Sequence, residues 1–397
     1  MTTPLPAGFQ TAAVEAGVKP GTSRLDLALF ISDQPCAAAG VFTTNLVCGA
    51  PVKVSRERLP CGTARGVVIN AGNANACTGD QGIADAQAMA AAVGEAIGCA
   101  GEDILVCSTG VIGRLLPVEK IVKGIATAAK ILSPSPEAFD QAARSIMTTD
   151  TFPKQVTREL HLAGGTARIT GVCKGAAMIA PNMATMLCVI MTDAKVTPEV
   201  AHAALKTAVA DSFNCISVDG HESTSDSVIL LANGVSGVDC SSGETQVLFS
   251  KAIADVAMEL AQLIIKDAEG ASHFVTIDVT GCRSREEAFK IAKTVADSAL
   301  VKTAICGADP NWGRIVSAAG YAGVPLLEEE VSLWINGIAL YAAGVPLPFD
   351  ATAASQSMRE NRDTHIDLRL TQGDASIRFW TSDLTKEYVA LNADYTT

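Results

Sequence analysis

The sequence predicts an α/β fold of layered sheets and helices, with a smaller α/β domain in its C-terminal part. Short β-branched or apolar runs alternate with longer stretches that favour helices, which is typical of α/β layers. Hydrophobic residues make up 48% of the chain and charged residues 18%, as in a compact globular enzyme. A chain of 397 residues is too long for one small core, so we expect two domains. The alternation does not determine the order of the strands.

Four apolar runs predict strands. The runs are short and rich in Val, Ile and Leu, which favours strands over helices. The last run is almost wholly apolar and predicts a buried strand. The four runs span residues 25–31, 66–70, 104–107 and 187–191.

Three segments predict helices. Residues 84–97 are rich in Ala, which is the strongest helix former. Ser250 is the expected N-cap of a helix over residues 252–266, and residues 285–299 follow a similar pattern. In the second helix the apolar positions on one face are Ile253, Ala257, Leu260 and Ile264.

Turn-forming residues divide the chain. The Ser-Pro-Ser-Pro run at 133–136 predicts a loop. The run 275–279 ends the helix-rich middle of the chain, and the Gly-Cys-Arg-Ser segment that follows favours a boundary. We therefore expect a larger domain over residues 1–280 and a smaller one over residues 281–397.

Charge and composition argue against several classes of partner. The formal net charge is −12, which does not favour binding to nucleic acid or to anionic lipid. No run of about 18 apolar residues predicts a membrane span, and the N-terminus lacks a signal pattern. The 12 Cys residues include no C-x-x-C pair, so we expect reduced, mostly buried thiols and a cytoplasmic protein.

The segment KGAAMIAPNMATML at residues 174–187 contains a candidate self-cleavage site. A Thr hydroxyl needs an adjacent base to act as a nucleophile. Cutting between Ala184 and Thr185 would free the α-amino group of Thr185, whose ordinary pKa of about 7.7–8.0 suits that task. Without the surrounding string, a Thr in an apolar run is ordinarily a strand residue.

Other motifs together with this string carry a family resemblance. They are GVFTTN at 40–45, NAGNANACTG at 70–79, STGVIG at 108–113, MTTDT at 147–151, GADPNWGR at 307–314 and LNADYTT at 391–397. In this order they resemble the glutamate N-acetyltransferase (ornithine acetyltransferase) family of arginine biosynthesis, which processes itself and uses an N-terminal Thr. The resemblance implies a fold of the ornithine acetyltransferase / DmpA-like type, with residues 1–280 as the catalytic domain. It also implies an α chain of residues 1–184 and a β chain of residues 185–397.

The resemblance assigns an oxyanion site. Thr109 and Gly110 follow the predicted strand 104–107, where a Thr-Gly loop can aim a hydroxyl and a backbone N–H at one point. By pattern alone this segment is a turn. The resemblance implies that both residues stabilise the tetrahedral intermediate formed by Thr185.

The resemblance also assigns substrate contacts. A lysine is suited to a substrate carboxylate as a compact positive charge. A glutamate after a helix C-terminus gains nothing from the helix dipole, which is consistent with binding a substrate amino group. C-terminal residues contact a substrate only if the tail docks at the site. With Thr185, the implied substrate-binding residues are Thr151, Lys174, Glu269, Asn392 and Thr397.

Two segments depart from the family pattern. Residues 174–177 read KGAA where the family reads KGSG, which removes a hydroxyl and flexibility just before the cut. Residues 219–226 read DGHESTSD where the family reads DGDTSTND, so no role carries over to His221, Glu222 or Ser225.

Three other patterns do not indicate sites. His221-Glu222 begins like a zinc-protease motif, but Ser225 stands where the second His belongs. The chain has no Gly-Lys dipeptide and hence no P-loop. Cys188, on a predicted buried strand, is expected to be a core thiol.

The predicted reaction moves an acetyl group from N2-acetyl-L-ornithine to L-glutamate through an acetyl-Thr185 ester. It needs no metal or organic cofactor, although acetyl-CoA is a possible co-substrate. The α and β chains are expected to form an α2β2 heterotetramer. Two alternatives remain open: an N-terminal-nucleophile amidase or aminopeptidase that passes the acyl group to water, and a non-catalytic amino-acid-binding protein that keeps the fold.

Overall fold

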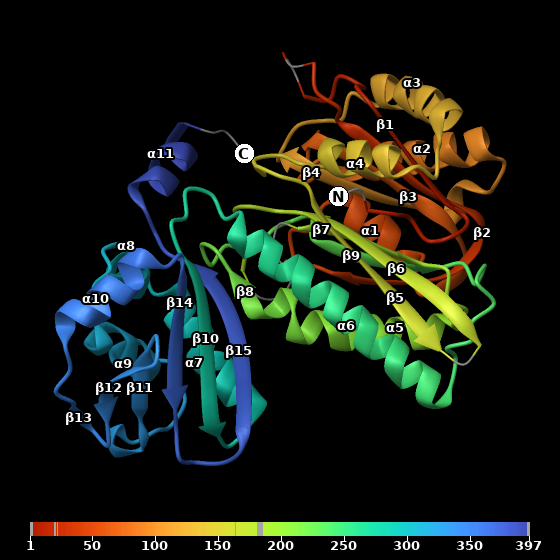
Figure 1. Ribbon diagram of the computed structural model, residues 1–397. Coiled ribbons are helices and arrows are strands. Elements are labelled where there is room, and N and C mark those ends of the chain that lie inside the picture. Colours follow the sequence, from red (N-terminus) through yellow and green to blue (C-terminus); the bar gives the residue numbers. More distant parts are fainter. Residues whose placement is uncertain (1–2, 20, 22, 163, 181–185, 395–397) are drawn as a thin grey trace.

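Two β-sheets with their helices build the molecule (Figure 1). The structure is a computed structural model that describes the chain except residues 1–2, 20, 22, 163, 181–185 and 395–397. The prediction of α/β layers is confirmed. Among the described residues, no helix combines the length and the apolar character that crossing a membrane requires.

The first sheet has eight strands. They are β1 (Phe9–Val14), β2 (Leu27–Phe42), β3 (Cys61–Asn73), β4 (Ile104–Val111), β5 (Lys154–Leu162), β6 (Gly165–Lys174), β7 (Leu187–Thr192) and β9 (Ser227–Ala232). Their order is β4-β3-β2-β9-β7-β6-β5, and β1 pairs with β2. The four strands predicted from apolar runs are confirmed. β2 extends well beyond residue 31 because β1, β3 and β9 all pair with it.

The strand β7 lies in the middle of this sheet. It pairs antiparallel with β6 and parallel with β9, so that Lys174 is opposite Leu187, and Leu187 is opposite Ser227. All of β7 is buried, since Cys188 and Ile190 face one core while their neighbours face another. The predicted buried strand is therefore confirmed. It begins two residues after Thr185, which lies outside the described residues.

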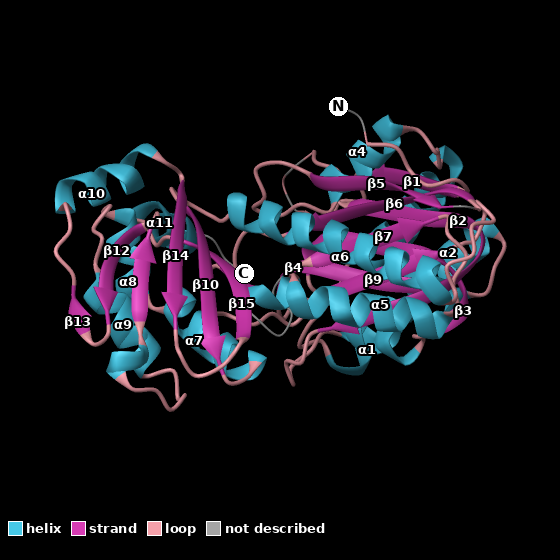
Figure 2. Ribbon diagram, turned by 60° about the horizontal axis from the view of Figure 1, so that its bottom comes forward, coloured by secondary structure: helices cyan, strands magenta, loops and turns pink. Residues whose placement is uncertain are grey.

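Six helices cover the first sheet: α1 (Ala50–Glu57), α2 (Gly79–Ile97), α3 (Val118–Ala128), α4 (Pro136–Ser145), α5 (Pro198–Asp211) and α6 (Gly243–Lys266). Figure 2 shows α5 and α6 side by side across one face of the sheet. Single-turn 3-10 helices are at Gly101–Asp103, Ala129–Ile131 and Phe213–Cys215.

The predicted start of α6 is wrong. The helix begins at Gly243, and Ser250 lies inside it with its hydroxyl donating to the carbonyl of Gln246 at 2.9 Å. A serine within a helix can satisfy its hydroxyl in this way, so a cap residue before an apolar stretch does not by itself mark a helix start. By contrast, Ser284 caps α7 (Arg285–Asp297), close to the predicted bounds.

The second sheet has seven strands in the order β13-β12-β11-β14-β10-β15-β8. They are β8 (Ile216–Ser217), β10 (Phe274–Cys282), β11 (Ser332–Ile335), β12 (Ile338–Ala342), β13 (Val345–Pro346), β14 (Asp363–Arg369) and β15 (Ala375–Ser382). Besides α7, the helices in this part of the chain are α8 (Ala299–Cys306), α9 (Trp312–Gly320), the 3-10 helix Glu328–Glu330, α10 (Ala351–Glu360) and α11 (Lys386–Asp394). The strand β10 pairs with β14 and β15, so this sheet includes residues before the predicted boundary at 280/281.

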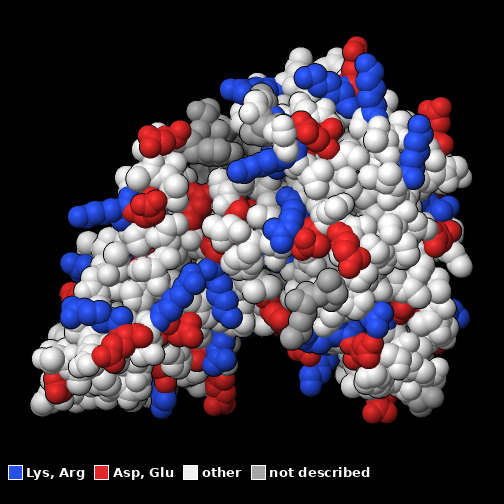
Figure 3. Space-filling model, turned by 45° about the horizontal axis from the view of Figure 1, so that its top comes forward, with Lys and Arg blue, Asp and Glu red and all other residues white. Residues whose placement is uncertain are grey.

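Charged side chains are mixed on the surface. On the face in Figure 3, basic and acidic side chains lie interspersed, and no broad basic area covers that face.

Candidate active site

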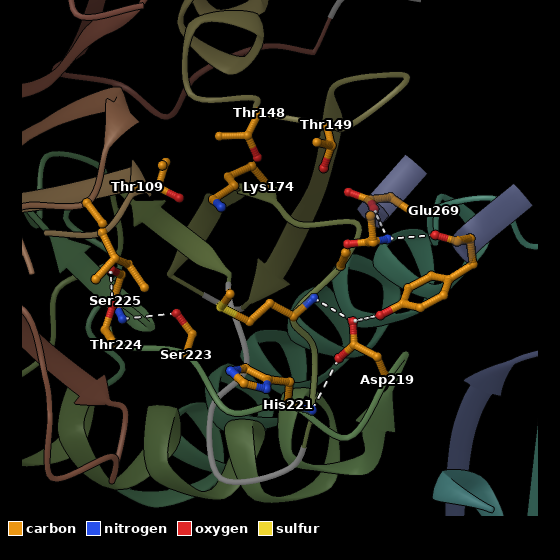
Figure 4. Close-up of a pocket in the computed structure, with 17 residues that line it drawn as sticks. Thr109, Thr148, Thr149, Lys174, Asp219, His221, Ser223, Thr224, Ser225 and Glu269 are labelled. Atoms are coloured by element: carbon orange, nitrogen blue, oxygen red, sulfur yellow. Dashed lines mark hydrogen bonds between the residues drawn. The ribbon is translucent and has the colours of Figure 1, made fainter. Parts of the chain in front are cut away.

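A cavity of about 280 Å³ lies where the first sheet meets the loops around α11. Residues from seven separate segments line it, and Figure 4 shows them pointing toward a common space. The lining residues are Ala74, Thr109, Gly110, Ile112, Thr148, Thr149, Lys174, Ala177, Met178, Asp219, His221, Ser223, Thr224, Ser225, Glu269, Tyr388 and Asn392. Five residues predicted for the site from the sequence are therefore brought together here: Thr109, Gly110, Lys174, Glu269 and Asn392.

Thr109 and Gly110 lie near the end of β4, beside β3. Gly110 has φ +129°, and a Cβ there would lie 2.3 Å from the backbone carbon of Gly72. Only glycine fits this close approach of two backbones. Thr109 is buried next to it. The position of a hydroxyl beside a glycine at a cavity wall is thus set by the pairing of β3 with β4.

Lys174 is the last residue of β6, and its side chain is buried. Burial lowers the pKa of Lys174 to about 8, even though Asp150 and Asp226 favour its charged form. Figure 4 shows its amine directed into the cavity. None of the described residues accepts a hydrogen bond from this amine. A buried amine that points into a cavity is well placed to bind an anionic group of a ligand.

The helix α11 brings the C-terminal part of the chain to the cavity. Asn392 donates from Nδ2 to Oε2 of Glu269 at 2.9 Å. The backbone nitrogen of Glu269 in turn donates to the carbonyl of Ala176 at 2.9 Å. The predicted carboxylate therefore lies between α11 and the segment that follows Lys174.

Asp219 and Tyr388 line the cavity but were not predicted. The hydroxyl of Tyr388 donates to Oδ2 of Asp219 at 3.1 Å, and Asp219 accepts the backbone N–H groups of Met178 and Ile179. Burial and then Asp219 raise the pKa of the Tyr388 hydroxyl. Met178 has φ +55°, an unusual conformation for a side-chain-bearing residue, which these two bonds hold in place. No local pattern links residues 169 positions apart, so the sequence held no signal for this pair.

Thr151 does not line the cavity. Its backbone N–H donates to Oδ2 of Asp267 at 3.0 Å, and its hydroxyl donates to Oδ1 of the same residue. Thr148 and Thr149, in the same motif, line the cavity instead. The substrate contact predicted for Thr151 stays a prediction. Ala184, Thr185 and Thr397 lie outside the described residues.

Asp226 is another residue of interest that the sequence did not single out. It is fully buried, and its Oδ1 accepts the backbone N–H of Met186 at 3.0 Å. Its Oδ2 has no hydrogen-bond partner among the described residues. Burial raises the pKa of Asp226 well above its ordinary value. Burial therefore favours the neutral form of this carboxyl, which lies next to the start of β7.

The segment that departs from the family pattern forms the floor of the cavity. His221 is exposed, and Figure 4 shows its ring at the cavity margin, beside Asp219. The hydroxyls of Thr224 and Ser225 lie 3.2 Å apart. No described cluster of His, Cys, Asp and Glu could hold a metal ion.

The cysteines are free, and most are buried. Cys188 lies in β7, and burial raises its thiol pKa well above the ordinary value. The prediction of a core thiol at Cys188 is confirmed.

Known proteins resemble this chain along almost its whole length. The sequence model of the ArgJ family matches residues 10–397. The chain is 46% identical to the arginine biosynthesis bifunctional protein ArgJ of Rhodopirellula baltica, with 99% of this chain and 96% of that protein covered. It is 45% identical to the protein of the same name from Geobacter sulfurreducens, with 98% and 99% covered. A solved structure of the arginine biosynthesis bifunctional protein argJ from Bacillus halodurans matches with 35% identity and a TM-score of 0.50, covering 51% of this chain and 96% of that chain.

Proposed function

The chain belongs to the ArgJ family of arginine biosynthesis, and we propose that it transfers acetyl from N2-acetyl-L-ornithine to L-glutamate. The products are L-ornithine and N-acetyl-L-glutamate. One observation supports this most directly: five predicted site residues, from four separate stretches of the sequence, line one cavity. We propose further that the enzyme acts in the cytoplasm.

The charged groups of the cavity fit amino-acid substrates. Lys174 is proposed to bind the α-carboxylate, which it attracts as a buried cation. Glu269 is proposed to bind an amino group, with Asn392 holding the carboxylate in position at 2.9 Å. Donor and acceptor are both α-amino acid derivatives, so the same pair of charges serves each in turn.

Thr185 is proposed as the nucleophile. Its hydroxyl oxygen attacks the carbonyl carbon of the acetyl group, and its α-amino group takes the hydroxyl proton. The carbon–nitrogen bond of acetylornithine then breaks, and the proton leaves with the ornithine amine. The amine of glutamate attacks the resulting ester, which restores the Thr185 hydroxyl. Thr109 and Gly110 would stabilise the oxyanion of each tetrahedral intermediate.

Processing between Ala184 and Thr185 is part of the proposal, because only a cut there frees the α-amino base. The described segments on either side support it, since Lys174 and Leu187 are paired neighbours at the cavity end of β6 and β7. The match to the Bacillus halodurans structure is consistent with a cut chain. Nearly all of that solved chain, 96%, corresponds to only 51% of this chain, so the solved chain is about half as long. We propose that the resulting α and β chains assemble as α2β2.

A mass spectrum of the purified protein combined with an exchange assay tests the proposal. Intact mass should show two chains with Thr at the new N-terminus. Incubation with acetylornithine should then yield ornithine only slowly without glutamate, and rapidly, with acetylglutamate, when glutamate is present. Ornithine release at the same rate without glutamate would instead identify the amidase. An uncut chain without either activity would identify a binding protein. Acetyl-CoA offered with glutamate shows whether it serves as a second donor.

A further inference from the structure

Lys154 is a buried cation just outside the cavity. Its Nζ lies 2.6 Å from Oδ1 of Asp150 and 2.6 Å from Oδ2 of Asp267, and all three side chains are at most 2% exposed. None of the three lines the cavity. They join the start of β5, the turn after α4 and the end of α6.

Asp150 connects this cluster to the Lys174 side of the cavity. Its Oδ1 accepts the backbone N–H of Gly175, the residue after Lys174, at 2.7 Å. Its Oδ2 accepts the backbone N–H of Thr148 at 3.0 Å. One carboxylate therefore holds both the residue after Lys174 and a threonine of the cavity wall.

Asp267 connects the cluster to the Glu269 side. It accepts the backbone N–H of Thr151 at 3.0 Å together with the Thr151 hydroxyl. It lies two residues before Glu269, whose backbone nitrogen donates to Ala176 at 2.9 Å. Figure 4 shows Thr148 and Thr149 along the same side of the cavity as Lys174 and Glu269.

Asp150 and Lys154 stabilise each other's charged form. Burial alone would raise the pKa of Asp150, but Lys154 and Lys174 hold it below its ordinary value. Burial alone would lower the pKa of Lys154, but Asp150 and Asp267 hold that pKa above its ordinary value. A buried ion cluster is a weak source of stability compared with apolar packing, yet it enforces one geometry. The hydrogen bonds from Asp150 and Asp267 to backbone groups therefore indicate that the cluster holds segments of the cavity wall in position.

We propose that Lys154, with Asp150 and Asp267, is a positioning clamp that sets the separation between Lys174 and Glu269. The clamp would thereby select ligands that carry both an α-carboxylate and an amino group. This inference rests on the proposed function for the identity of the ligand. Lys154 itself touches no ligand and acts through the two segments that its carboxylate partners hold.

Ligand binding to the processed full protein tests the clamp. Titration calorimetry compares ornithine with 1,4-diaminobutane, which is ornithine without its α-carboxylate. Lys154→Met should weaken ornithine binding by about tenfold or more, because small displacements of positioned groups are costly. Binding of 1,4-diaminobutane should change by less than about threefold, since the group that Lys174 recognises is absent from it. Lys290→Met is the matched control, because Lys290 forms an exposed ion pair with Glu286 on α7; it should leave both affinities unchanged.

Asp267→Asn serves as a second variant in case Lys154→Met does not fold. It keeps the shape of the side chain. Like Lys154→Met, it should lower the preference for ornithine over 1,4-diaminobutane. Equal preference in wild type and in the folded variants would overturn the clamp, and so would a wild type that binds no ornithine. A wild type that binds ornithine but exchanges no acetyl would instead overturn the proposed function and leave the clamp to be judged by the titrations.

Discussion

Oδ1 of Asp226 accepts a hydrogen bond of 3.0 Å from the backbone nitrogen of Met186, the first described residue after the proposed cut. The carbonyl of Met186 accepts in turn from the nitrogen of Ser227 at 3.2 Å. These bonds join the start of β7 to the start of β9. The backbone that follows the proposed nucleophile is therefore held by a buried carboxyl and by strand pairing together.

Asp226→Asn should preserve processing, because an amide oxygen can still accept the Met186 N–H. It should also raise the melting temperature at neutral pH. The raised pKa of Asp226 means that the folded chain keeps a proton that the unfolded chain releases above about pH 4, so wild-type stability falls as the pH rises through that range. The stability difference should shrink toward pH 4. Thermal melts at several pH values and intact mass measure both effects.

Asp226→Ala is the contrasting variant. It leaves the Met186 N–H without its acceptor, which costs about 1–3 kcal/mol for a buried donor. If Asn impaired processing as severely as Ala, the ionised carboxylate would be required and the neutral form assigned to Asp226 would be wrong.

Thr185→Ala should remain a single uncut chain without acetyl exchange, because it lacks the hydroxyl that attacks. Thr185→Ser should still be cut, since it keeps a hydroxyl. Gel electrophoresis and N-terminal sequencing distinguish these outcomes. A wild-type chain that stays full-length, or one cut at another bond, would contradict the proposed junction.

Thr109→Ala should lower kcat by roughly 10²–10³, as expected for loss of one oxyanion donor. The fold should persist, because the close approach at Gly110 does not depend on the hydroxyl. Steady-state kinetics on a fully processed sample measure the effect. A loss of about tenfold or less would assign oxyanion stabilisation to another group.

The pH dependence of kcat/KM should carry opposite contributions from two amines. The α-amino group of Thr185 must be neutral to act as base, so activity rises with pH through about 7.7–8.0. Lys174 must be charged to bind the carboxylate, so activity falls as the pH passes its pKa of about 8. In Lys174→Met the falling limb should disappear, together with a large loss of kcat/KM. A falling limb that persisted in this variant would show that another group titrates there.

The α and β chains should stay associated after processing without a covalent link. Extracting β7 together with Met186 would expose buried apolar side chains, among them Met186, Leu187, Val189 and Ile190. Exposing each large side chain costs about 1.5–3 kcal/mol of free energy. Two such units should pair into α2β2, the closed two-fold being the commonest symmetry of soluble oligomers. Light scattering on processed protein decides this. A mass near 40.9 kDa would contradict the dimer, and separation of the chains without denaturant would contradict the shared core.

The sequence by itself determined the α/β class, the buried strand β7 and the family, each of which is confirmed. Periodicity and apolar runs record which face of an element is buried, and motifs such as NAGNANACTG are long enough to identify a family. Lys174 could be named as a candidate because it lies inside such a motif, and Glu269 because the family resemblance implies a substrate contact at its position.

Only the tertiary structure decided which polar side chains meet. Thr148 and Thr149 line the cavity while Thr151 is bound to Asp267, a distinction that depends on where the end of α6 lies. The Lys154–Asp267 contact joins residues 113 positions apart, and the Tyr388–Asp219 contact joins residues 169 apart. Such contacts follow from strand order and helix docking. A local pattern of hydrophobic and polar residues fixes the faces of an element but not its neighbours, so these contacts had no signal in the sequence.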